Sequence, residues 1–158
     1  MSFGTGHHET TQLMLEEILE IPCEGKTVVD CGCGTGVLAI LAGKRGAKKI
    51  KGFDVEHWAC ENTIENFERN NISGIVECKG VESIQNEEYD IVIANINRNI
   101  LVNSMSQFSH SLAKGGILLL SGFYIQDIDI IKVSASQNNL KFISFREKNN
   151  WVACRFTR

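Results

Sequence analysis

The sequence predicts a single α/β domain with a mostly parallel sheet, helices on both faces and an antiparallel hairpin at the carboxyl end. Apolar runs rich in β-branched residues alternate with amphipathic helical stretches, which is typical of parallel sheets. Two apolar runs at residues 140–145 and 151–156 then flank a polar turn at residues 147–150, which predicts the hairpin. The 158 residues suit one domain that folds without a metal or a disulfide.

The first half of the chain contains two helix-strand transitions. Residues 9–19 are expected to be helical because leucine and isoleucine recur at helical spacing and a proline follows. A short apolar strand is expected at residues 27–30, and a glycine-rich turn separates it from an apolar helix at residues 37–42. A second strand at residues 50–53 precedes an amphipathic helix at residues 58–69.

The second half continues the alternation. A weaker third strand is expected at residues 74–78, and a strongly apolar fourth strand at residues 90–94. Residues 99–112 are expected to be helical, with a Lys-Gly-Gly sequence ending the helix. An apolar fifth strand follows at residues 117–121, and a helix at residues 125–135 leads to the hairpin.

Composition excludes several classes of protein. The net charge of −3 and the pI near 5.8 argue against a dedicated nucleic-acid binder, so no direct contact with nucleic acid is expected. No apolar run is long enough to cross a membrane, and residues 1–11 do not resemble a signal peptide. We therefore expect a cytoplasmic protein with no membrane partner.

The six cysteines are interpreted as reduced, buried thiols, because most of them fall within apolar runs. Cys31 and Cys33 form C-x-C, which is not the C-x-x-C of a redox or zinc site. His7 and His8 are adjacent but lack further ligands nearby, so no metal site is expected.

The most informative segment is the glycine-rich turn after the first predicted strand. Gly32, Gly34 and Gly36 permit positive φ and a close approach of a ligand to the backbone. Dinucleotide-binding turns follow the pattern G-x-G-x-x-G and have a glycine where this chain has Val37, so the sequence does not match a dinucleotide site. The spacing instead suits S-adenosylmethionine, whose cationic groups the carboxylate of Asp30 would match, directly or through water. The alternative is that Asp30 only caps the turn.

Two further polar residues follow strands. Asp54, after the second strand, can accept two hydrogen bonds from ribose hydroxyls; alternatively, it is an ordinary turn residue. Asn95, after the fourth strand, can orient an acceptor amine toward the methyl group of the cofactor, since ligands of open α/β sheets bind at this edge. Asparagine is also common in turns. Residues 2–11 are rich in glycine and threonine, and we interpret them as a flexible lid over the cofactor, with Thr10 and Thr11 at the N-cap or in the first turn of the following helix.

The chain resembles the ribosomal protein L eleven methyltransferases (PrmA) over essentially its whole length. Residues 3–11, FGTGHHETT, resemble the F-G-T-G-x-H-x-T-T pattern of that family. Similar matches occur in the glycine turn and helix at residues 30–40, at Ala94-Asn95-Ile96, and at Trp151-Val152-Ala153. The resemblance implies the seven-stranded Rossmann-like fold of S-adenosylmethionine-dependent methyltransferases. It also implies trimethylation of the α-amine and lysine side chains of that large-subunit ribosomal protein, with cofactor contacts at Thr11, Gly32, Asp54 and Asn95.

The chain departs from the family pattern in three places. Glu9 stands where proline is common, and Asn97 and Arg98 stand where small or apolar residues are common. Family members also carry an N-terminal substrate-binding domain, whereas this chain begins inside the FGTG pattern. We expect residues 1–158 to be the catalytic domain, either excised or belonging to a truncated relative with another target.

Three other functions remain open from the sequence. One is methylation of an RNA, which the acidic balance disfavours, and another is methylation of a small molecule. The third is binding of S-adenosylmethionine without catalysis. Methylation of a protein glutamine is disfavoured, because Asn95 is not followed by two prolines and an aromatic residue.

Overall fold

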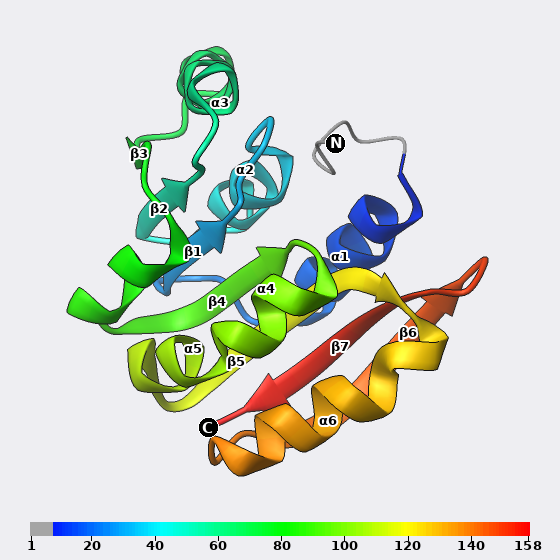
Figure 1. Ribbon diagram of the computed structural model, residues 1–158. Coiled ribbons are helices and arrows are strands. Elements are labelled where there is room, and N and C mark those ends of the chain that lie inside the picture. The colour runs from blue at the N-terminus through cyan, green and yellow to red at the C-terminus, as the bar shows by residue number, and fades with distance from the viewer. Residues whose placement is uncertain (1–7) are drawn as a thin grey trace.

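The computed structural model describes residues 8–158, apart from the side chains of residues 85 and 86. These residues form a seven-stranded sheet in the order β3-β2-β1-β4-β5-β7-β6 (Figure 1). Strands β1 to β5 run parallel, whereas β7 is antiparallel to both β5 and β6. The predicted α/β fold with a terminal antiparallel hairpin is confirmed. The strands are β1 (Thr27–Cys31), β2 (Lys49–Phe53), β3 (Ile75–Glu77), β4 (Tyr89–Asn95), β5 (Leu112–Tyr124), β6 (Lys141–Lys148) and β7 (Trp151–Thr157).

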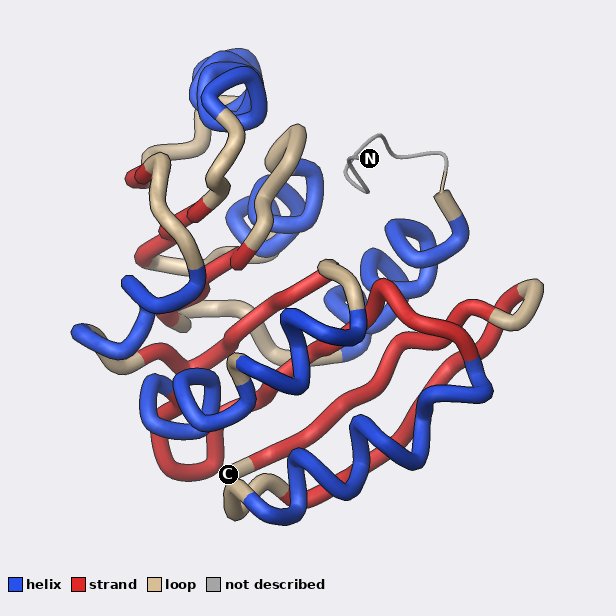
Figure 2. The backbone as a smooth tube through the Cα atoms, in the orientation of Figure 1, coloured by secondary structure: helices blue, strands red, loops and turns tan. Residues whose placement is uncertain are grey.

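Helices cover both faces of this sheet (Figure 2). Val28 of β1 packs in a cluster with α1 and α2, whereas its neighbour Val29 packs in a cluster with α4, α5 and α6. This alternation follows from the strand period of two, because successive side chains point to opposite faces. The helices are α1 (Glu9–Glu20), α2 (Val37–Lys44), α3 (His57–Arg69), α4 (Arg98–Asn103), α5 (Met105–Ser111) and α6 (Ile128–Gln137), with 3-10 turns η1 (Val81–Asn86) and η2 (Ile125–Asp127).

The prediction of one helix at residues 99–112 is wrong. Ser104 leaves the helical conformation, with φ −106° and ψ 3°, and separates α4 from α5. The strand expected at residues 117–121 is also longer, because β5 begins at Leu112 and includes the Lys-Gly-Gly sequence. Leu112 pairs with Tyr89 of β4, so sheet pairing overrides the local turn signal there.

The interpretation of all cysteines as reduced thiols is wrong for two of them. Cys60 in α3 and Cys78 after β3 form a disulfide with a Cα–Cα distance of 6.0 Å. The other four cysteines are free and buried, as expected; they are Cys23, Cys31, Cys33 and Cys154. The pairing depends on α3 packing beside the end of β3, which spacing along the chain does not encode.

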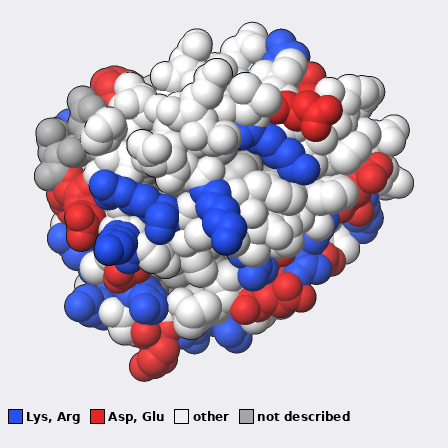
Figure 3. All heavy atoms as spheres, turned by 90° about the horizontal axis from the view of Figure 1, so that it is seen from below, with Lys and Arg blue, Asp and Glu red and all other residues white. Residues whose placement is uncertain are grey.

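The surface of the described part of the chain carries both signs of charge. Figure 3 shows one face on which lysine and arginine side chains occur together with aspartate and glutamate side chains. This mixture of charges agrees with the small net charge of −3. No helix within residues 8–158 is both long and apolar enough to cross a membrane.

Candidate active site

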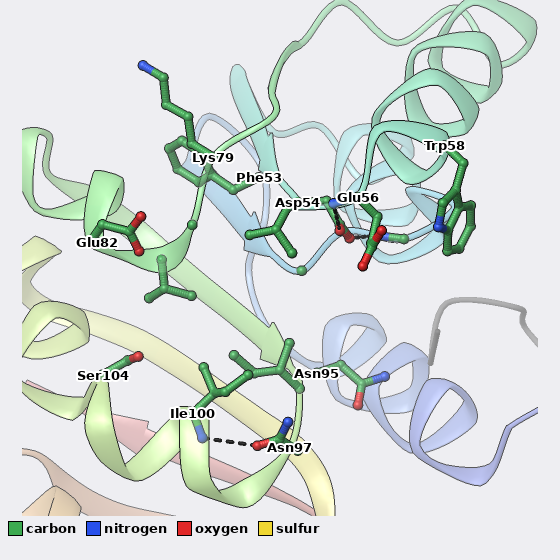
Figure 4. A pocket seen from close by; sticks show the side chains of 16 residues that line it. Phe53, Asp54, Glu56, Trp58, Lys79, Glu82, Asn95, Asn97, Ile100 and Ser104 are labelled. Atoms are coloured by element: carbon green, nitrogen blue, oxygen red, sulfur yellow. Dashed lines mark hydrogen bonds between the residues drawn. The ribbon is translucent and has the colours of Figure 1, made fainter. Parts of the chain in front are cut away.

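A cavity of about 600 Å³ opens at the carboxyl ends of β1, β2 and β4. The strand order reverses between β1 and β4, and such a reversal is where open α/β sheets bind ligands. One side of the cavity is formed by the end of β2 and the start of α3, and the other by the end of β4 and by α4 (Figure 4). The turn after β1 and the segment between β3 and η1 complete the wall.

The glycine turn lies at the base of this cavity. Gly32, Gly34 and Gly36 all have positive φ, at 76°, 56° and 84°. A Cβ atom at Gly32 would lie 2.5 Å from Cγ2 of Ile96, so glycine is needed here both for the conformation and for the space. Gly32 and Gly34 line the cavity, whereas Gly36 is the N-cap of α2 and packs against Thr63 of α3.

The carboxylate of Asp54 connects two parts of the cavity wall. Its Oδ2 accepts a hydrogen bond from the amide of Gly34, and its Oδ1 accepts one from the amide of Glu56, each at 3.0 Å. An ionised carboxylate has about four acceptor positions, so capacity remains for two hydroxyl groups of a ligand. Asp54 therefore holds the glycine turn and can also bind a ligand.

Asn95 lies across the cavity from Asp54 (Figure 4). Its side chain is buried at the end of β4, and Oδ1 has no hydrogen-bond partner among the described residues. A buried carbonyl oxygen without a partner costs free energy, and such groups in native proteins are commonly satisfied by a ligand or water. Asn97, two residues later, is the N-cap of α4 and accepts a hydrogen bond from the amide of Ile100 at 3.1 Å.

Asp30 and Thr11 do not line the cavity. Asp30 is buried on the sheet face that carries α1 and α2, and neither of its oxygens has a hydrogen-bond partner within residues 8–158. Burial, reinforced by the negative charge of Asp54, raises the pKa of Asp30 to about 7. Thr11 is buried in the first turn of α1, whose N-cap is His8. Of the sequence-predicted site residues, Gly32, Gly34, Asp54 and Asn95 are thus brought together in the wall.

Several wall residues were not predicted from the sequence. Trp58 from α3, Glu82 from η1 and Ser104 between α4 and α5 line the cavity (Figure 4). They follow three different strands, and only the topology brings them to one edge of the sheet. The lid predicted at residues 2–11 falls mostly outside the described residues. Within the described part, Nδ1 of His8 accepts a hydrogen bond from the amide of Thr10 at 3.2 Å.

The sequence pattern of the family described as "Ribosomal protein L11 methyltransferase (PrmA)" matches residues 1–158. The chain belongs to the PrmA family. The PrmA relative from Bacteroides fragilis is 46% identical over 158 residues, which cover 99% of this chain and 56% of the relative. The relative from Porphyromonas gingivalis is 47% identical and is covered to 55% of its length. The chain therefore spans about half the length of these curated PrmA relatives.

One solved structure agrees with the PrmA assignment, and another agrees with the fold. The crystal structure of a ribosomal protein L11 methylase from Lactobacillus delbrueckii subsp. bulgaricus has a TM-score of 0.91 and 27% identity to this chain, covering 97% of it and 80% of that chain. A putative methyltransferase complexed with SAH has a TM-score of 0.79 at 14% identity, which shows a shared fold. The predicted seven-stranded methyltransferase fold is confirmed.

The wall of the PrmA cavity fits the cofactor that this family implies, S-adenosylmethionine. The volume of about 600 Å³ is in the range of small-molecule sites. Asp54 offers acceptor capacity for ribose hydroxyls, and Gly32 and Gly34 line the cavity with backbone alone, so a ligand can lie against it. The carbonyl oxygen of Asn95, on the wall opposite Asp54, is buried without a partner and can accept a hydrogen bond from an amine.

Proposed function

We propose that this chain carries the cofactor site and the catalytic asparagine of an S-adenosylmethionine-dependent N-methyltransferase that acts on amino groups of ribosomal protein L11. Family membership supports the reaction class. The observation that carries the proposal is the buried, unpartnered Oδ1 of Asn95, a residue that lines the same cavity as Asp54 and the glycine turn. An acceptor oxygen at that place suits an incoming amine.

The cofactor-binding role falls mainly to the turn after β1 and to the end of β2. Asp54 would accept hydrogen bonds from the ribose hydroxyls, and Gly32 and Gly34 would let the cofactor lie against the backbone. Gly36 acts indirectly, because its left-handed conformation lets the turn pass directly into α2. Asp30 and Thr11 are buried and do not line the cavity. We assign Asp30 to the cationic methionine end of the cofactor through water, and keep Thr11 as a cofactor contact by its resemblance to the family.

Asn95 would act on the acceptor. S-adenosylmethionine supplies an activated methyl group on its sulfonium, so the acceptor nitrogen needs a free lone pair and the correct direction. The Oδ1 of Asn95 accepts a hydrogen bond from one N–H group of a neutral amine, which leaves the nitrogen lone pair to face the cavity. Positioning of this kind supplies much of the rate, and a strong base on the protein is not required.

Substrate capture is proposed to need more than residues 1–158. The curated relatives are almost twice as long as the part that this chain covers. We propose that residues 1–158 form the catalytic domain and that a separate surface holds the ribosomal protein. The protein is further proposed to work in the cytoplasm, where ribosomal proteins are made, without membrane or direct nucleic-acid contact.

The test measures transfer of labelled methyl groups to purified ribosomal protein L11, with mass spectrometry of the product. This chain should transfer methyl groups slowly, and a fusion to the N-terminal part of a relative should transfer them much faster. In the fusion, Asn95→Ala should lower kcat by about 100-fold, and SAH affinity, measured by calorimetry, should fall by a much smaller factor because Asn95 is also a predicted cofactor contact. Methylation of RNA or of free metabolites in preference to the protein would contradict the proposal, as would full activity of Asn95→Ala.

A further inference from the structure

The disulfide between Cys60 and Cys78 lies directly behind the cavity wall. Cys60 is in the first part of α3, two residues after Trp58, and Cys78 immediately precedes Lys79. Trp58 and Lys79 both line the cavity. The covalent bond therefore joins two wall segments that come from different elements.

Strand pairing does not extend to this part of the wall. The register between β2 and β3 ends at the pair Phe53 and Glu77, so Cys78 is the first residue beyond it. Strand β3 has only three residues, and Ile75 within it is 54% exposed. A short, exposed edge strand opens easily, so the segment from Cys78 into η1 depends on other contacts for its position.

The same disulfide is close to Asp54. The Sγ of Cys60 lies 3.4 Å from the backbone carbonyl oxygen of Asp54, and the Asp54 side chain holds the glycine turn and the start of α3. A change in the bonding of Cys60 is thus transmitted by direct contact to the residue assigned to the ribose.

We propose that Cys60 and Cys78 form a reversible thiol-oxidation site, and that the oxidised form binds S-adenosylmethionine and SAH more tightly than the reduced form. The inference rests on the proposed cofactor site. In the oxidised form the disulfide fixes the segment from Cys78 to η1 against α3. In the reduced form that segment is free to move away, and only the fraction of molecules with the wall in place binds well.

The chemistry is a thiol–disulfide exchange with a low-molecular-weight disulfide. Cys78 is exposed and Cys60 is 7% exposed, so the thiolate of Cys78 attacks first and expels one small thiolate. The Nδ1 of His57 lies 3.6 Å from the Sγ of Cys78 and can accept its proton. The thiolate of Cys60 then attacks the Sγ of Cys78 and expels the second small thiolate. Two protein thiols are oxidised, and one small disulfide is reduced to two thiols.

The experiment combines thiol counting with cofactor titration on the full chain. After reduction, intact mass under denaturing conditions with N-ethylmaleimide should show adducts on all six cysteines. After treatment with oxidised glutathione it should show adducts on the four remaining free ones. Calorimetry with SAH should then give roughly 3- to 10-fold tighter binding for the oxidised form, the change expected when the wall is in place in about 10–30% of reduced molecules.

The variant Cys78→Ser is the matched control, because this side chain is exposed and its replacement leaves the core intact. It should bind SAH as the reduced chain does, with or without oxidised glutathione. An unchanged count of six thiols after oxidation would overturn the proposal. So would a count of four with equal SAH affinity in both forms, while the cofactor site itself would stand. Absence of SAH binding in both forms would overturn the cofactor site and the oxidation proposal together.

Discussion

The carboxylate of Asp54 accepts a hydrogen bond from the backbone amide of Gly34 at 3.0 Å. This bond links the end of β2 to the glycine turn after β1, two neighbouring strands of the parallel sheet. The second oxygen of Asp54 accepts from the amide of Glu56, next to the start of α3. One side chain therefore fixes three segments of the cavity, and its loss should affect ligand binding more than overall stability.

Replacement of Asp54 by alanine should weaken SAH binding. The variant loses acceptors for the ribose hydroxyls and frees the Gly34 amide, which together should cost about 1.5–3 kcal/mol of binding free energy. Calorimetric titration measures the change. Asp129→Ala, an exposed carboxylate on α6, serves as the control and should leave affinity unchanged. Equal affinity of the Asp54 variant and the parent chain would show that Asp54 is an ordinary turn residue.

Replacement of Gly32 by alanine should destabilise the fold more than replacement of Gly25. Both glycines have similar positive φ, 76° and 71°, so each variant bears conformational strain of about 1–2 kcal/mol. A Cβ atom at Gly25 meets nothing within 4 Å, whereas at Gly32 it would lie 2.5 Å from Cγ2 of Ile96. This overpacking should add about 1–3 kcal/mol in urea unfolding.

The clash can be tested separately from the strain. Adding Ile96→Ala to Gly32→Ala removes the atom that the new Cβ meets, so the double variant should lose less stability than the sum of the two single variants. If the losses of stability in the two single variants add up to the loss in the double variant, the clash between the new Cβ and Ile96 costs nothing. The backbone strain alone would then explain why position 32 requires glycine.

The buried Asp30 should make stability depend on pH in the cofactor-free protein. Its pKa is raised to about 7 by burial and by the charge of Asp54, whereas an unfolded aspartate has a pKa near 3.9. The folded state therefore binds more protons than the unfolded state between these values, and the free energy of unfolding falls as pH rises from about 4 to about 7.

The variant Asp30→Asn carries no titrating group at position 30, so its free energy of unfolding should not show the fall with rising pH that Asp30 causes. Urea unfolding of both proteins at about pH 5 and about pH 8 isolates the effect of Asp30, since all other groups are shared. We expect the variant to gain stability relative to the parent chain at the higher pH. A difference that is constant with pH would show that the carboxyl titrates alike in the folded and unfolded states.

Replacement of Glu17 by alanine should lower stability strongly. The Glu17 side chain is 2% exposed and joins α1 to the hairpin through ion pairs with Arg146 and with Arg155, the latter at 2.9 Å. Its removal leaves Arg146 and Arg155 with the exposed carboxylate of Glu20 as their only shared partner within residues 8–158. Two partly buried guanidinium groups then lose their buried acceptor, at a cost of about 1–3 kcal/mol in urea unfolding. Glu16→Ala is the matched control, since Glu16 is 43% exposed and lies 3.6 Å from Arg146. It should cost less than about 1 kcal/mol, and a similar loss for both variants would contradict a special role for the buried pair.

Local sequence determined the order of the elements and much of the candidate site. The glycines at 32, 34 and 36 predict a strand-turn-helix with close ligand approach, because positive φ at these places depends on residue type and not on distant contacts. Asp54 and Asn95 were selected because they follow apolar strands, and parallel strands bring their carboxyl ends to one edge. The family was recognised from the same local patterns and is confirmed by the match over residues 1–158.

Tertiary structure alone decided the remaining features, because each depends on which residues distant in sequence become neighbours. Asp30 lies on the same sheet face as Val28, which packs against α1 and α2, because residues two apart in a strand share a face. It therefore does not line the cavity. Cys60 and Cys78 meet only because α3 packs beside the end of β3. Glu17 finds its two arginines on a hairpin more than a hundred residues later. Hydrophobic periodicity specifies which face of an element is buried, but it does not specify which other element covers that face. Contacts between distant residues depend on that choice, so local sequence patterns do not predict them.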